Sequence, residues 1–229
     1  MELEELENIH PYVKENRYVY NGISVPRVTE IISKMIHEDY IVSWANGLGF
    51  KHKSYSKTLK SAADYGTFAH TSIELFLKGE PITGYSINPV EGFKKWWSIV
   101  NQTNEVKIIG QEFKLVCSWF GGTYDLLLSI NDKIYLVDFK TSNHLSYKYC
   151  LQLAAYNYML KLGNIANISG IIILQLSKTE PGFNEFFLDF SNKEDLDYFQ
   201  FCEKTFLSLA YSYYHILEAE KRYKLREDK

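Results

Sequence analysis

The spacing of hydrophobic residues changes near residue 105. Before this point, apolar side chains recur every three or four positions, which is typical of helices packed on one face. After it, β-branched and aromatic residues gather in short runs separated by turn residues, which is typical of strands. We therefore predict helices over 28–36, 61–78 and 90–100, and a small hairpin over 17–25 around the turn signal Asn21-Gly22.

The second part of the chain predicts a sheet. Three consecutive strands are expected first, with Asn131-Asp132 as one of the turns, and then a helix, two strands and a terminal helix that is either continuous or broken. In chain order these elements cover 105–117, 119–130, 133–140, 146–163, 168–177, 183–190 and 192–228. The order indicates an α/β fold with a mixed sheet. Because no repeat or low-complexity linker appears, we expect one domain over residues 1–229.

Length and composition are those of a globular protein. Of the 229 residues, 46% are hydrophobic and 23% are charged, which disfavours disordered and fibrous classes. No apolar run reaches the roughly 18 to 20 residues of a membrane span, and the acidic start differs from a secretory leader. We expect a soluble, intracellular protein that does not interact with membranes. Cys117, Cys150 and Cys202 are widely separated, so neither a disulfide framework nor a structural zinc site is indicated.

The net charge of −3 conceals a basic segment. Four of the first seven residues are glutamates, whereas residues 51–60 carry four lysines and no acid. Lys51, Lys53, Lys57 and Lys60 are candidate phosphate contacts, and a solvated helix face is the plain alternative. Aromatic residues make up 16% of the chain, and they either pack in the core or stack on bases. The candidates for stacking are Trp44, Tyr55, Tyr147 and Tyr149.

Two acids and a lysine are expected to meet at the end of the third strand. Asp138 and Lys140 are two residues apart in an apolar strand and point to the same face, and a neighbouring strand can bring Asp125 beside them. Two carboxylates in a dry cleft repel unless a cation compensates, and a hard divalent metal ion supplies that charge. The lysine can hold a phosphate oxygen or assist an attacking water. An ordinary ion pair at a strand end is the alternative.

Two of the predicted helices offer further polar groups. His70 lies one turn after Gly66, where the missing Cβ would let the helix approach a neighbouring backbone closely, so that the imidazole could reach a metal ion. Gln152 and Tyr156 form an i, i+4 pair on the helix after the third strand and are expected to face the same region. Ordinary packing would also account for each of these side chains.

In their order and spacing, these residues resemble the RecB-like branch of the PD-(D/E)XK nuclease superfamily. The resemblance covers the chain from Gly66 to Tyr156, and its motifs are Gly66-x-x-x-His70, Glu112, Gly122-x-x-Asp125, Asp138-Phe139-Lys140-Thr141 and Gln152-x-x-x-Tyr156. The segment from Val25 to Thr29 also looks like the front segment of phage and mitochondrial single-strand exonucleases of this branch.

The resemblance implies a restriction-endonuclease-like αβββαβ core, preceded by a hairpin and helices, that hydrolyses DNA phosphodiester bonds with Mg²⁺ or Mn²⁺. By motif, the metal would be bound by His70, Asp125, Asp138 and the Phe139 carbonyl. Lys140 would assist the nucleophilic water, and Gln152 and Tyr156 would complete the site. Glu112 matches a motif acid and is interpreted as a supporting residue, whereas Glu74 is not expected to bind metal. Thr141 and Tyr147 join the four lysines as expected nucleic-acid contacts.

The expected activity is exonucleolytic cleavage of single-stranded DNA ends in repair, recombination or replication. In this interpretation residues 1–60 are an N-terminal elaboration, 61–177 the catalytic core and 178–229 a C-terminal strand and helix, and residues 38–64 could form an arch. The cysteines do not match the iron–sulfur members of the branch, so no such cluster is expected. A structure-specific or restriction-like endonuclease, a binding module without cleavage, and an α/β protein with a chance motif remain alternatives. The choice between DNA and RNA, and any protein partners, stay open.

Overall fold

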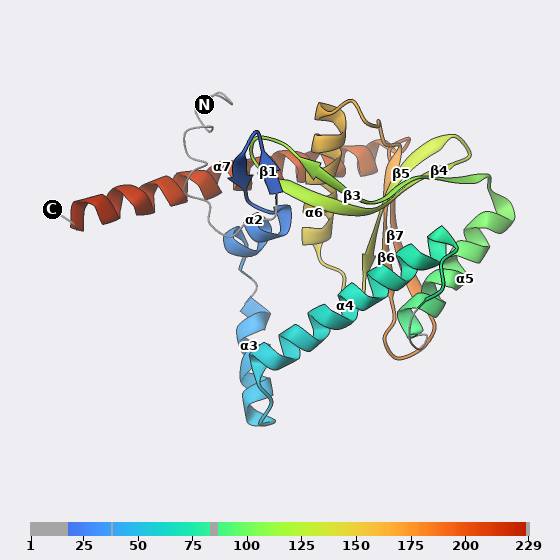
Figure 1. Ribbon diagram of the computed structural model, residues 1–229, viewed down its shortest axis with the longest axis horizontal. Helices are drawn as coiled ribbons and strands as arrows, with labels where there is room; N and C mark the ends of the chain where they lie inside the picture. The colour runs from blue at the N-terminus through green and yellow to red at the C-terminus, as the bar shows by residue number, and fades with distance from the viewer. Residues whose placement is uncertain (1–17, 38, 83–86, 228–229) are drawn as a thin grey trace.

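The computed structural model describes residues 18–37, 39–82 and 87–227. The glutamate-rich start and residue 17 of the expected hairpin lie outside these residues. Figure 1 shows a central sheet with helices on both of its faces. The mixed α/β architecture predicted from the sequence is therefore confirmed. None of the helices in the described part of the chain combines the length and the apolar character that crossing a membrane requires.

The sheet has five strands in the order β3-β4-β5-β6-β7. Neighbouring strands are antiparallel except β5 and β6, which are parallel and are connected through a helix. The carboxyl ends of β5 and β6 therefore lie at the same edge of the sheet. The bounds are β3 (Val106–Val116), β4 (Gly121–Ile130), β5 (Lys133–Lys140), β6 (Gly170–Leu176) and β7 (Phe183–Asp189).

Alternation along β5 sends side chains into two separate hydrophobic cores. Leu136 packs in the core under α2 (Val28–Met35), α6 (Tyr147–Leu162) and α7 (Lys193–Glu227). Val137 and Phe139 pack in the core under α4 (Tyr55–Lys78) and α5 (Asn88–Thr103). The chain order α5-β3-β4-β5-α6-β6 is the αβββαβ order that the family resemblance implies.

Local signals fix several of these elements. Asn21 and Gly22 both have positive φ, as a two-residue hairpin turn requires, and they join β1 (Tyr18–Tyr20) to β2 (Ile23–Val25). Ser146 caps α6 by accepting a hydrogen bond from the backbone N–H of Lys148, as its place before the helix suggests. The predicted hairpin and the helix over 146–163 are confirmed.

The structure corrects the boundaries of the helical front. The helix expected from residue 61 begins at Tyr55, where Ser54 accepts a hydrogen bond from the backbone N–H of Lys57. A further helix, α3 (Asp39–Phe50), was not predicted, because Gly47 and Gly49 are poor helix formers that interrupt its pattern. The terminal helix α7 is continuous.

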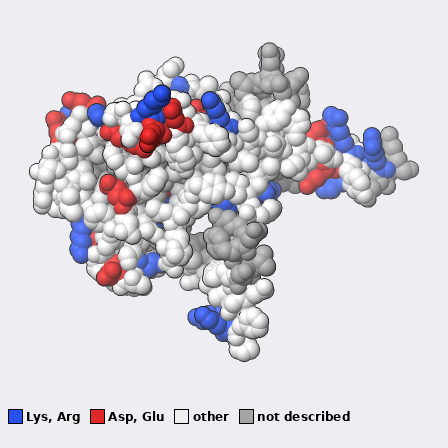
Figure 2. All heavy atoms as spheres, turned by 180° about the vertical axis from the view of Figure 1, so that it is seen from behind, with Lys and Arg blue, Asp and Glu red and all other residues white. Residues whose placement is uncertain are grey.

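Together α3 and the start of α4, residues 39–60, form a projection that we call the arm. It extends away from the sheet in Figure 1, and Figure 2 shows basic side chains at its tip. The rings of Trp44 and Tyr55 meet edge to face at 5.3 Å and join the two helices. The exposed fraction of Phe50, next to the tip, is 88%. The arm thus combines lysines and aromatic rings on a part of the chain that contributes little to the core.

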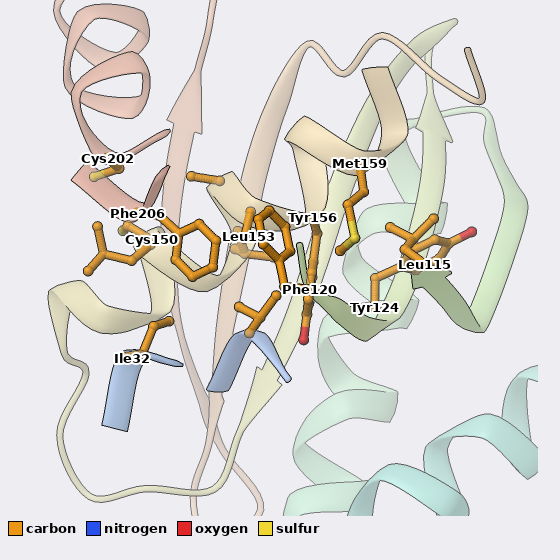
Figure 3. Packing of buried hydrophobic residues seen from close by; sticks show 14 of the residues in the cluster. Ile32, Leu115, Phe120, Tyr124, Cys150, Leu153, Tyr156, Met159, Cys202 and Phe206 are labelled. Carbon is orange, nitrogen blue, oxygen red and sulfur yellow. The ribbon is translucent and has the colours of Figure 1, made fainter. Parts of the chain in front are cut away.

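On the α6 face, one glycine makes room for a buried tyrosine. Figure 3 shows Tyr156 among Phe120, Leu153 and Met159. A Cβ on Gly122 of β4 would overlap the ring of Tyr156, so α6 can pack this closely only because Gly122 has no side chain.

Replacing Gly122 by alanine should therefore destabilise the protein by about 1 to 3 kcal/mol, since the added methyl group overpacks the core. Gly66→Ala is the matched control. Its Cβ would meet Thr141 Oγ1 at 3.5 Å, an ordinary contact, and alanine favours the helix by about 0.5 to 1 kcal/mol. Urea unfolding of both variants measures the difference, and equal stabilities would contradict this account of the packing.

Candidate metal centre

The first part of the site joins β4 to α4. Asp125 directly precedes Leu126, whose pair with Val137 is the first along β4 in the register with β5. Its Oδ2 accepts a hydrogen bond of 2.7 Å from the backbone N–H of Phe139, and its Oδ1 lies 3.2 Å from His70 Nδ1. The ring of Phe139 packs edge to face against His70, with ring centres 5.7 Å apart. The aspartate and the imidazole are therefore held in place by neighbours in the core.

Glu112 enters this site because the backbone of β3 departs from regular strand geometry. Its φ is 45°, a left-handed value that is uncommon for residues other than glycine and costs free energy. The pairs Gln111 with Leu126 and Phe113 with Tyr124 flank it, while Glu112 itself has no partner in the β3–β4 register. Its Oε1 lies 3.9 Å from His70 Nδ1. Ligand atoms of His70, Glu112 and Asp125 all lie within 4.8 Å of one another.

The second part of the site joins β5 to α6. Lys140 Nζ lies 2.8 Å from Asp138 Oδ1 and 2.7 Å from its Oδ2, and it donates a hydrogen bond of 3.3 Å to Gln152 Oε1. The Gln152 amide donates to Asp138 Oδ1 at 3.3 Å and to Tyr156 Oη at 3.0 Å. Asp138 and Gln152 are both buried, and this network satisfies Asp138 Oδ1 and the Gln152 amide group.

The carboxyl groups of the site are crowded. Burial, reinforced by the negative charge of Asp125, raises the pKa of Glu112 to about 7. Burial also raises the pKa of Asp138 to about 6; the Lys140 ammonium opposes this shift and Asp125 adds to it. Burial would raise the pKa of Asp125 as well, but attraction to His70, together with a hydrogen bond from it, lowers that pKa below its usual value.

Both cations of the site are stabilised in their charged forms. Burial alone would lower the pKa of Lys140, but the charges of Asp138 and Asp125 outweigh it and raise the pKa. The same competition, decided by the attraction and hydrogen bond of Asp125, raises the pKa of His70 to about 9. Lys140 is thus held as an ammonium, which can donate hydrogen bonds but cannot accept a proton.

The donor set fits a divalent cation. The compact cluster offers two carboxylates and, once the His70 ring gives up a proton, one imidazole nitrogen, which suits Mn²⁺ as well as Mg²⁺. In addition, Asp138 Oδ2 is buried without a well-directed hydrogen bond, although Lys140 Nζ is close to it. A cation would compensate the surplus of carboxylates that raises the pKa values of Glu112 and Asp138.

Most residues predicted from the sequence lie in or beside this centre. His70 and Asp125 belong to the compact cluster, whereas Asp138 lies next to it in the Lys140 network. Phe139 contributes its N–H to Asp125, and coordination by its carbonyl stays a prediction. The expected close backbone approach at Gly66 is wrong, because the nearest group is the Thr141 side chain at ordinary contact distance.

Two residues have roles that differ from, or were missing in, the sequence interpretation. Glu112, expected only in support, lies in the compact cluster. Tyr149 was considered only for stacking on bases, yet its ring centre is 4.7 Å from Lys140 Nζ, a cation–π contact. The spacing of Tyr149 and Gln152, three apart on one helix face, could have revealed this. Glu74, by contrast, pairs with Lys78 at 2.6 Å, in agreement with the expectation that it is not a metal ligand.

The predicted nucleic-acid contacts fall into two groups. Thr141 directly follows Lys140 at the end of β5, and Tyr147 is 54% exposed at the first position of α6. The other group lies exposed on the arm and does not belong to the metal centre: Lys51, Lys53, Lys57 and Lys60.

Comparisons with known proteins add little to this geometry. No family model matches the chain, and no curated protein matches it either. A solved structure described as "Crystal structure of SSO0001" has 14% sequence identity and a TM-score of 0.39, with 91% of this chain and 86% of that one covered. The functional conclusion therefore rests on the site itself.

Asp125→Asn should weaken Mn²⁺ binding at least about tenfold, because it removes a charged ligand that is held by both Phe139 and His70. Isothermal titration calorimetry on the full chain measures this. Asp64→Asn, which removes an exposed carboxylate from the same helix as His70, is the matched control and should bind as the wild type does. Equal affinities for all three proteins would show that the cluster is not the metal site.

Proposed function

We propose that this protein is a metal-dependent nuclease that hydrolyses DNA phosphodiester bonds. The observation that carries the proposal is the convergence of His70, Glu112 and Asp125 with buried Asp138 and its partly buried partner Lys140 at the junction of β4 and β5. Phosphodiester hydrolysis requires charge compensation on the phosphate and an oriented water, and these residue types provide both. The order of the motifs, which resembles that of the PD-(D/E)XK nucleases, is the reason for proposing phosphodiester hydrolysis as the reaction.

The residues divide into those that hold the cation and those that act beside it. His70, Glu112 and Asp125 would bind the ion, with Asp138 available next to them. A bound Mg²⁺ or Mn²⁺ supplies a lowered water pKa and neutralisation of phosphate charge. Lys140, fixed by Asp138 and Gln152, would hold a phosphate oxygen or the attacking water by hydrogen bonds.

Gln152 and Tyr156 act as positioning residues in this proposal. The Gln152 amide fixes the Asp138 carboxylate from one side, and Tyr156 accepts from the same amide. Burial raises the pKa of Tyr156 far above its usual value, so the phenol stays neutral. A carboxylate and an ammonium held in this way need little reorganisation when substrate binds.

Within this class we propose exonucleolytic action on single-stranded DNA inside the cell. The projecting arm, with lysines and aromatic rings, is a suitable element for guiding an unpaired strand. Circular single-stranded DNA tests this part separately: an enzyme that needs a free end should leave the circle intact while degrading the linear form. Cleavage of both at similar rates would favour an endonuclease.

Lys140→Ala should reduce the cleavage rate of an end-labelled oligonucleotide by about 100-fold or more, because the positioned ammonium is lost. The wild type should cleave with Mg²⁺ or Mn²⁺ and stop when EDTA is added. Lys161→Ala is the control, since this lysine pairs with Glu203 on the outer part of α6. It should cleave as the wild type does.

A wild-type protein that binds the metal ion and DNA but cleaves no substrate would contradict the proposed activity. It would instead identify the protein as a binding module that keeps the fold. Cleavage retained in Lys140→Ala would mean that the active site lies elsewhere.

A further inference from the structure

Two surface hollows meet at Lys178, on the loop between β6 and β7. The first, of about 440 Å³, lies at the carboxyl ends of β5 and β6, and Thr141 is in its lining. The second, of about 560 Å³, runs along the start of α4 and is lined by Lys53, Lys57 and Tyr65. Lys178 belongs to both linings, so the two hollows are neighbours, and we call them together the Lys178 groove.

The groove begins beside the candidate metal centre. Thr141 directly follows Lys140, and its Oγ1 faces Gly66, one helical turn before His70 on α4. From there the groove passes Lys178 and reaches the base of the arm at Lys53. A chain molecule bound at the centre therefore has a path along the protein surface towards the arm.

The charge along the second hollow is positive. Lys53, Lys57 and Lys178 line it, and its lining contains no aspartate or glutamate. Over the residues that the structure describes, none of these three lysines forms a salt bridge, whereas Lys78 at the other end of α4 is paired with Glu74. Ammonium groups gathered without carboxylate partners suit a ligand that carries repeated negative charges, such as a phosphate backbone.

The loop that carries Lys178 is anchored to α5. The Asn88 side chain donates a hydrogen bond of 2.9 Å to the Lys178 carbonyl, and Lys95 Nζ donates one of 2.6 Å to the Pro181 carbonyl. Gly92 of α5 lies so close to the backbone of Gly182 that a Cβ there would overlap it. The backbone at Lys178 is therefore held in position before any ligand binds, which lowers the entropic cost of binding.

The remaining surfaces of the groove suit an unpaired strand. Lys178 Nζ lies 5.4 Å from the ring centre of Tyr65, so an aromatic face and a cation stand together. In the first hollow, Gln175 donates to the Ser142 carbonyl at 2.8 Å and accepts from Asn184 at 3.2 Å, which fixes a polar wall. Aromatic rings beside positive charge are typical of sites that bind single strands with little sequence preference.

We infer that the Lys178 groove binds the single-stranded DNA that extends from the metal centre, with Lys178, Lys53 and Lys57 contacting its phosphates. The inference rests on the proposed function, because it assigns the path of that site's substrate strand. It adds Lys178, a loop residue outside the recognised motifs, as a phosphate-binding residue for the substrate strand.

The test is the binding of a labelled oligodeoxythymidylate to the full chain by fluorescence anisotropy in EDTA, where cleavage cannot occur. Lys178→Ala should weaken binding about 3- to 10-fold and reduce the slope of log affinity against log salt by about 0.7, the value for one lost phosphate contact on a single strand. Lys178→Arg should retain the affinity, and Lys178→Glu should weaken it further. Lys161→Ala, which removes one positive charge elsewhere, is the control.

Unchanged affinity and salt slope in Lys178→Ala would overturn the inference, and so would an equal loss in Lys161→Ala, which would reflect net charge alone. The two proposals fail in different ways. If the wild type cleaves DNA and Lys178→Ala binds and cleaves normally, the groove is wrong and the nuclease stands. If no protein cleaves but Lys178→Ala still loses binding, the groove stands and the nuclease is wrong.

Discussion

The compensation of buried charge at the end of β5 is the constraint on which the site depends. Asp138 is only 1% exposed, and a carboxylate in that position is tolerated only with a cation and hydrogen-bond donors against it. Lys140 provides the cation and Gln152 the donor, and Gln152 in turn needs Tyr156. The ring of Tyr156 packs against Gly122, and α6 can lie this close to the sheet only because Gly122 has no side chain. Residues of the proposed catalytic site therefore also take part in the packing of the core.

The protein's own groups compensate only part of the charge. Three carboxylates, from Glu112, Asp125 and Asp138, face two cations, His70 and Lys140, and burial with mutual repulsion raises the pKa of Glu112 and of Asp138. The left-handed backbone of Glu112 adds a conformational cost for bringing a further acid into this place. The repulsion between buried carboxyl groups and the left-handed backbone of Glu112 both cost free energy. Both are consistent with a site at which a bound divalent ion supplies the missing positive charge.

The alternation of hydrophobic and polar residues and the helix-capping residues made much of the fold predictable. Features that depend on an unusual backbone conformation or on contacts between distant parts of the chain were not predictable. The period of two along β5 placed Asp138 and Lys140 correctly on one face, and Ser146 marked the start of α6. The role of Glu112 was not predictable, because a left-handed residue within a strand leaves no trace in the hydrophobic pattern. Lys178 was missed for a similar reason: its position depends on contacts between a loop and α5, which are distant in sequence.

The most direct test of the account is anomalous diffraction from crystals of the protein grown with Mn²⁺. The account predicts a strong peak among His70 Nδ1, Glu112 and the Asp125 carboxylate, with the hydrogen bond from the Phe139 N–H to Asp125 retained. A peak at another place, or none at these residues while their side chains keep the arrangement described above, would contradict the claim that a metal ion completes this buried charge cluster.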